Sequence, residues 1–100
     1  MISIPDAKVA GFCRKNHIRR LSLFGSVLGD HFGPDSDIDV LVEFEPGQTP
    51  GFIGLYNMEE ELSVLLSGRK IDLFTLKFLN TRIRDRVLAQ AQVQYQHDEG

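Results

Sequence analysis

The segment from Leu23 to Phe44 constrains the fold and the chemistry of this 100-residue chain more than any other part of it. Its pattern predicts an apolar strand, a Gly-Ser turn, a polar connection, and a second apolar strand that begins with two aspartates. Asp37 and Asp39 flank Ile38, and side chains alternate faces along a strand, so both carboxylates project from the same face. Neighbouring carboxylates repel each other unless a cation lies between them. Magnesium takes oxygen ligands of this kind, usually together with substrate phosphates, so the pair predicts a magnesium site.

A third aspartate, Asp72, lies inside the apolar strand predicted for residues 70–76. A lone acid is costly in such a strand unless it has a partner. If this strand neighbours the strand at Asp37–Phe44, Asp72 joins the same cluster, and three carboxylates could hold two Mg²⁺ ions about 4 Å apart. The alternative is that Asp72 only pairs with Arg69 or Lys70.

The Gly25-Ser26 pair supplies a complementary feature between the two strands. Glycine allows a phosphate to approach the backbone closely. The amides of the helix start that follows, together with the Ser26 hydroxyl, can donate to the phosphate oxygens of a nucleotide. Ser26 could also simply cap that short helix.

Composition narrows the class of protein. One hundred residues predict a single domain, 1–100, with no room for a separate substrate-recognition domain. The net charge of −3 argues against a general nucleic-acid-binding surface but leaves a nucleotide substrate open. Cys13 lies in a helical pattern, which favours a buried small residue. A single cysteine cannot form an intrachain disulfide, which fits a reducing cytoplasm. No apolar run approaches the length of a membrane span, and the N-terminus does not resemble a signal peptide.

Helical and strand patterns alternate along the chain. This alternation predicts an α+β (α/β) domain, with a small three-stranded mixed sheet flanked by about four helices. The glutamine-rich end is expected to fray. The expected elements are a helix from Pro5-Asp6, a strand at 21–24, one or two helical turns at 27–31, a central strand at 37–44, a flexible loop at 45–54, a helix at 55–66, a strand at 70–76 and a last helix capped by Asn80 or Thr81.

Two other interpretations of the acidic motif fit the sequence less well. Asp37 and Asp39 could be solvated strand-end acids that cap the turn at 33–36. A calcium loop starting at Asp35 would need a glycine and a terminal glutamate where this chain has Val40 and Pro46, so that hypothesis fits poorly.

A basic cluster precedes the first strand. It fits a solvated face, or a contact with an acidic partner or RNA. The cluster comprises Arg14, Lys15, His17, Arg19 and Arg20.

Apolar positions left over on the terminal helices could form a surface for a homo-oligomer or a hetero-oligomer.

The order of these motifs resembles a known family. Gly25-Ser26, ten residues, Asp37-Ile38-Asp39 and then Asp72 is the pattern of the DNA polymerase β-type nucleotidyltransferase superfamily. The segments 23–26 and 34–42 are similar to its small stand-alone branch, the MNT-type minimal nucleotidyltransferases. The resemblance implies a polymerase β-like fold, with Asp37, Asp39 and Asp72 as catalytic metal ligands for two Mg²⁺ ions. It also implies that Gly25 and Ser26 bind the triphosphate of ATP.

The same resemblance implies a partner, a HEPN-domain toxin, and an activity. Some MNT proteins act as antitoxins by transferring AMP from ATP to a tyrosine of that toxin. Relatives often carry arginines between the two motifs, where this chain has Gly29 and Gly33, so an antitoxin that acts by binding alone is the main alternative. Transfer to a small molecule is a further one, although antibiotic-modifying relatives generally use an added domain.

Overall fold

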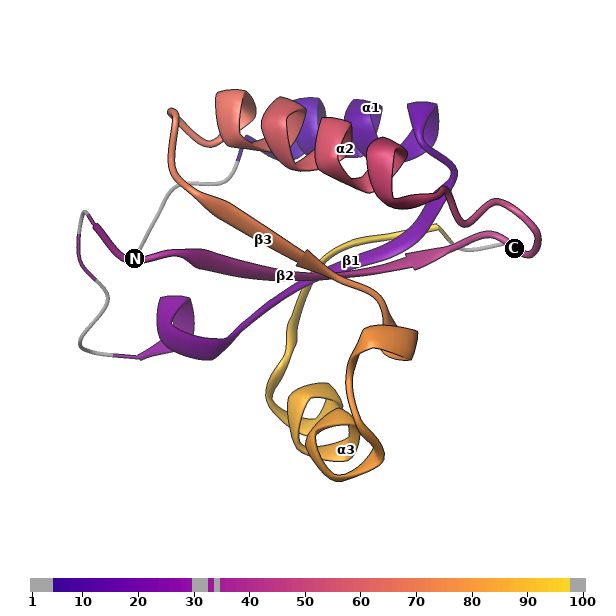
Figure 1. Cartoon of the computed structure of the whole chain (residues 1–100). Helices are drawn as coiled ribbons and strands as arrows, with labels where there is room; N and C mark the ends of the chain where they lie inside the picture. The colour runs from indigo at the N-terminus through magenta and orange to yellow at the C-terminus, as the bar shows by residue number, and fades with distance from the viewer. Residues whose placement is uncertain (1–4, 30–32, 34, 98–100) are drawn as a thin grey trace.

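The computed structural model describes residues 5–29, 33 and 35–97 as three α-helices, two short 3-10 helices and four strands. Figure 1 shows two helices on one side of the sheet and the third helix on the other. In chain order the elements are α1 (Asp6–Lys15), β1 (Ile18–Phe24), η1 (Gly25–Leu28), β2 (Ile38–Phe44), α2 (Phe52–Leu65), β3 (Ile71–Phe74), η2 (Leu76–Phe78), α3 (Thr81–Gln90) and β4 (Gln92–Gln96).

The sheet is mixed, as predicted, with the strand order β3-β2-β1-β4. β1 runs antiparallel to both β2 and β4, and β2 runs parallel to β3. The central position expected for β2 is confirmed. The expected number of strands was wrong, because the glutamine-rich segment does not fray but forms β4, where Leu21 pairs with Tyr95. The number of α-helices is three among the described residues, not about four, because the short helix after β1 is a 3-10 turn.

Alternation along β2 explains which elements cover each face. Ile38, Val40 and Val42 are almost completely buried in the main core, which lies between the sheet and the pair α1 and α2. Leu41 faces the opposite side and belongs to a smaller cluster with residues of α3 and the segment before it. Because side chains alternate along the strand, Asp39 shares this second, more thinly covered face with Leu41.

The helix boundaries follow local signals. The Asn80 side chain accepts a hydrogen bond of 3.0 Å from the Ile83 amide and caps α3, as predicted. α2 ends where Ser67 and Gly68 adopt positive φ and the Gly68 amide donates to the Ser63 carbonyl at 2.8 Å. The apolar face of α2 packs into the core, with Leu62 only 1% exposed.

Some predicted boundaries shift. β1 begins at Ile18 rather than residue 21, and β3 ends at Phe74 rather than residue 76. The predicted helical turns at 27–31 correspond to η1, while His31 lies outside the described residues. Cys13 is fully buried, and burial raises the pKa of its thiol to about 12. No helix among the described residues has the length and hydropathy to cross a membrane.

Candidate active site

Asp39 and Asp72 lie side by side on neighbouring strands. β2 and β3 pair in parallel with Asp39 opposite Asp72, so the adjacency expected for the two acidic strands is confirmed. The preceding register pair, Ile38 and Ile71, is buried in the main core at 0% and 5% exposure. The two aspartates therefore project from the other face of the sheet.

The carboxylates of the cluster repel one another. The pKa of Asp39 is raised first by its partial burial, then by the charge of Asp72 and then by that of Asp37. Each cause disfavours the ionised form in the absence of a cation. The three predicted aspartates are thus close enough to influence one another electrostatically, which is the arrangement that a bound cation would stabilise.

Asp37 lies just before β2 and has a basic neighbour. Lys70 Nζ is 3.6 Å from Asp37 Oδ2, and both side chains are substantially exposed. The sequence suggested Lys70 as a partner for Asp72, whereas the structure places it beside Asp37. The cause is the parallel pairing of the two strands, whose first hydrogen bond joins the Ile38 amide to the Lys70 carbonyl at 2.9 Å.

Arg69 contacts the turn before Asp37, a role that the sequence, which suggested it only as a partner for Asp72, did not predict. Its guanidinium donates to the carbonyl oxygens of Gly33 and Ser36, at 3.2 Å for Ser36, and so anchors the turn that leads into Asp37. A relative with arginines between the Gly-Ser pair and the aspartates would carry a positive charge within that segment. In this chain Arg69 brings the positive charge from the segment before β3. Only the pairing of β2 with β3 could have revealed this position of Arg69.

The Gly25-Ser26 turn meets the aspartates directly. Gly25 has φ +75°, and a Cβ atom built on it would lie 2.3 Å from Asp39 Oδ2, so only glycine fits here without displacing that carboxylate. The Ser26 hydroxyl donates a 3.3 Å hydrogen bond to the Asp37 carbonyl oxygen. No side chain caps η1, so Ser26 does not serve as the helix cap considered from the sequence.

The donor set suits a hard divalent cation. It consists of carboxylate oxygens, which magnesium prefers, and the repulsion at Asp39 would be relieved by a positive charge. Within the described part of the chain, no three acidic, histidine or cysteine side chains are already arranged to hold a metal ion. A cation would therefore have to draw the carboxylates closer together.

Comparisons with known proteins find relatives over most of the chain. Residues 7–100 match the family model described as Polymerase beta, Nucleotidyltransferase. A Methanocaldococcus jannaschii protein, provisionally named a protein adenylyltransferase, is 32% identical over 84% of this chain and 87% of its own length. The protein adenylyltransferase MntA of Thermococcus cleftensis is 34% identical over 73% of this chain and 71% of its own length.

Solved structures share the fold. A toxin–antitoxin structure with AMP-PNP superposes with a TM-score of 0.75 at 22% identity, over 96% of this chain and 77% of the other. A complex described as a tri-AMPylated Shewanella oneidensis HEPN toxin with an MNT antitoxin superposes with a TM-score of 0.67 at 23% identity, over 92% of this chain and 70% of the other. At these identities the likeness establishes that the fold is shared.

Proposed function

This chain belongs to the polymerase beta nucleotidyltransferase family, and we propose that it transfers AMP from ATP to a hydroxyl group of a partner protein. The observation that carries the proposal is the meeting of Asp39 and Asp72, in register on parallel strands, with the Gly25 turn against Asp39. In the reaction the acceptor oxygen bonds to the α-phosphorus. The bond from that phosphorus to the bridging oxygen of the β-phosphate breaks, and pyrophosphate leaves.

The proposed partner is a HEPN-domain toxin, and the proposed acceptor is a tyrosine hydroxyl. Support comes from relatives named protein adenylyltransferases and from a structure of the same fold described as an AMPylated HEPN toxin bound to an MNT antitoxin. Modification of the toxin would make this chain an antitoxin. Neutralisation by binding alone is the competing function, and the experiment below separates the two.

The chain's own residues supply positioning and charge. We assign the backbone at Gly25 and the hydroxyl of Ser26 to the phosphates that depart as pyrophosphate. Asp37, Asp39 and Asp72 would hold two magnesium ions, which when bound would neutralise triphosphate charge and polarise the reacting oxygens. An ionised carboxylate of this cluster can also accept the proton that the acceptor hydroxyl loses. Lys70 Nζ lies 3.6 Å from Asp37 Oδ2, so its ammonium group is close enough to orient that carboxylate.

The test is the intact mass of the HEPN-domain partner after incubation with this chain, ATP and magnesium. We expect increases by whole AMP units with the wild type and none with Asp39→Asn or Asp72→Asn. Asp85→Asn, an exposed position on α3, is the matched control and should keep full transfer. Full activity in either active-site variant would overturn the mechanism. An unchanged partner mass in a stable wild-type complex would favour neutralisation by binding alone.

A further inference from the structure

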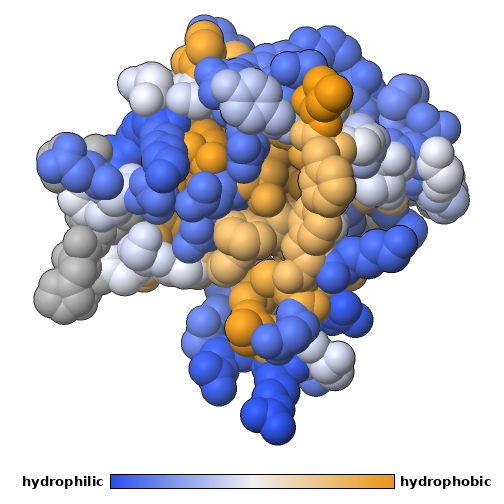
Figure 2. Space-filling view, viewed as in Figure 1, coloured by the Kyte–Doolittle hydropathy of each residue, from blue (hydrophilic) through white to orange (hydrophobic). Residues whose placement is uncertain are grey.

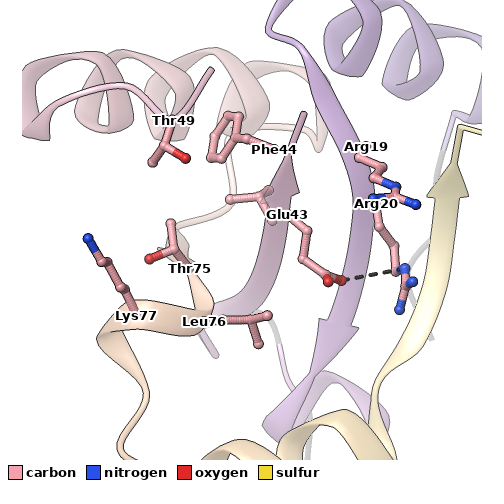
Figure 3. Close-up of a pocket in the computed structure, with 9 residues that line it drawn as sticks. Arg19, Arg20, Glu43, Phe44, Thr49, Thr75, Leu76 and Lys77 are labelled. Atoms are coloured by element: carbon pink, nitrogen blue, oxygen red, sulfur yellow. Dashed lines mark ion pairs between the residues drawn. The ribbon is translucent and has the colours of Figure 1, made fainter. Parts of the chain in front are cut away.

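A pocket of about 370 Å³ opens on the same face of the sheet as the carboxylate cluster, beyond the other end of β2. Figure 3 shows Glu43 in the middle, with Arg19 and Arg20 from β1 on one side and Lys77 on the other. Glu43 follows Asp39 by four residues, so both side chains face the same way, about 13 Å apart along the strand. None of the three aspartates lines this pocket.

The pocket is positively charged although the chain as a whole is negative. Three basic side chains line it, Arg19, Arg20 and Lys77, against one acidic side chain, Glu43, whereas the net charge of the chain is −3. A break in the β1–β2 register between Ile18 and Arg20 accompanies this arrangement of two consecutive arginines at one pocket. The charge balance favours an anionic ligand.

The polar groups inside the pocket are incompletely paired. Arg20 Nε and Glu43 Oε2 form an ion pair at 3.5 Å, yet both atoms are buried and neither makes a hydrogen bond among the described residues. The hydroxyl-bearing Thr49 and Thr75 line the same pocket. Arginine and threonine donors beside one carboxylate acceptor suit a carboxylate-bearing peptide segment, which offers acceptors together with backbone N–H donors.

An exposed apolar surface adjoins the pocket. Phe52 at the start of α2 is 79% exposed and Phe78 of η2 is 50% exposed, and their rings stack with centroids 5.8 Å apart. Ile53 and Tyr56 extend the surface along α2 at 80% and 59% exposure. Figure 2 shows hydrophobic side chains gathered in a band that runs from the region of α2 across the middle of the molecule towards α3. An apolar centre beside a charged rim is the anatomy of a protein interface, so the pocket is better suited to part of a protein than to a free small anion.

The direction of attack places the acceptor on this side. Attacking and leaving oxygens lie roughly in line in phosphoryl-group chemistry. In the proposed reaction the departing phosphates lie at Gly25, which follows the β1 residue that pairs with Asp39. The acceptor must therefore approach from the opposite direction, along the face that leads to Glu43 and Lys77.

We infer that this pocket, together with the Phe52–Phe78 surface, docks the protein that carries the acceptor hydroxyl, with an acidic segment of that protein seated among Arg19, Arg20 and Lys77. The inference rests on the proposed function for the identity of the partner. It adds the place where the partner binds and the charge that it must present.

The experiment measures two affinities by isothermal titration calorimetry, one for the HEPN-domain protein and one for AMP-PNP with magnesium. The double variant Arg19→Glu/Lys77→Glu should weaken binding of the HEPN-domain protein about tenfold or more, because two attractive charges become repulsive. Its affinity for AMP-PNP should stay within about twofold. The control Lys8→Glu/Arg14→Glu makes the same change in net charge on exposed positions of α1, across the sheet, and should alter neither affinity.

Each other outcome overturns the inference. Unchanged affinity for the HEPN-domain protein would show that the pocket does not bind it. A selective loss of AMP-PNP affinity would show that the pocket binds the nucleotide instead. Equal losses in both double variants would show a general charge effect. If the wild type binds the partner without transferring AMP, the proposed function fails while the docking inference is still decided by these affinities.

Discussion

Substitution of Gly25 by alanine should damage catalysis far more than folding. The added Cβ would lie 2.3 Å from Asp39 Oδ2, whereas ordinary contacts begin at 3.4 Å, so the carboxylate oxygen must retreat by about 1 Å. The clash is with the end of a side chain, and rotation of Asp39 relieves it at little cost to the fold. Misplacement of a reacting group by about 1 Å can cost about 100-fold in rate, and we expect a loss of that size in AMP transfer.

The backbone contributes a separate and smaller effect. Gly25 has φ +75°, and a residue with a Cβ in this conformation destabilises the folded state by about 1–2 kcal/mol. Gly47 has the same φ but nothing within 4 Å of its added Cβ, so Gly47→Ala carries the backbone strain without the clash. Comparison of the two variants therefore isolates the displacement of Asp39.

The assay pairs initial rates of AMP transfer with free energies of unfolding in urea. Both variants should lose similar stability, and only Gly25→Ala should lose transfer activity. A Gly25→Ala rate within about threefold of the wild type, or equal rate losses in both variants, would refute the claim that Gly25 sets the position of Asp39.

Three further predictions concern stability. Because burial and the neighbouring aspartates raise the pKa of Asp39, the folded state binds its proton more tightly than the unfolded state. The folded state therefore loses stability as pH rises through the raised pKa of Asp39. Without magnesium, Asp39→Asn should have a higher melting temperature than the wild type at pH 7, and the difference should vanish below the ordinary pKa of 3.8. A lower melting temperature of the variant at pH 7 would contradict this. Asn80→Ala removes the cap of α3 and should cost about 1 kcal/mol in urea unfolding, whereas exposed Asn57→Ala on α2 should cost nothing measurable; equal effects would remove the capping role. Leu62→Ala should cost about 2–5 kcal/mol because Leu62 is 1% exposed, against less than about 0.5 kcal/mol for 77%-exposed Val64→Ala, and similar losses would contradict the assigned core.

The sequence could predict that the aspartates lie together because the pattern of each strand is local. Alternation along the strand predicted for residues 37–44 places Asp37 and Asp39 on one face, and the apolar pattern around Asp72 predicts a second strand. The structure confirms this pairing by the register of Asp39 with Asp72. The roles of these residues in catalysis stay predictions that the variants above test.

The strand β4 escaped prediction because its sequence lacks a strand's usual apolar content. β4 (Gln92–Gln96) follows α3 after Ala91 alone, and all five of its side chains are exposed or half-buried. What places it is backbone pairing with the edge of β1, a contact between distant segments that composition does not encode.

Strand pairing also sets the positions of Arg69, Lys70 and the basic pocket, so the sequence alone could not predict them. The parallel start of β2 and β3 brings Lys70 to Asp37, and the shifted pairing near Ile18 accompanies Arg19 and Arg20 at one pocket. The sequence showed a basic cluster that fitted either solvent or an acidic partner. The structure separates its members, because Arg19 and Arg20 line this pocket while Arg14 and His17 line a smaller one by Cys13.

The most direct test of the central claim follows the label of the nucleotide. The HEPN-domain partner is incubated with this chain, magnesium and ATP carrying ³²P at either the α- or the γ-phosphorus. Nucleotidyl transfer predicts that the partner acquires the α-label and none of the γ-label, with pyrophosphate released in equal amount. Label from the γ-phosphorus, or no label in a partner that is bound and neutralised, would contradict the account.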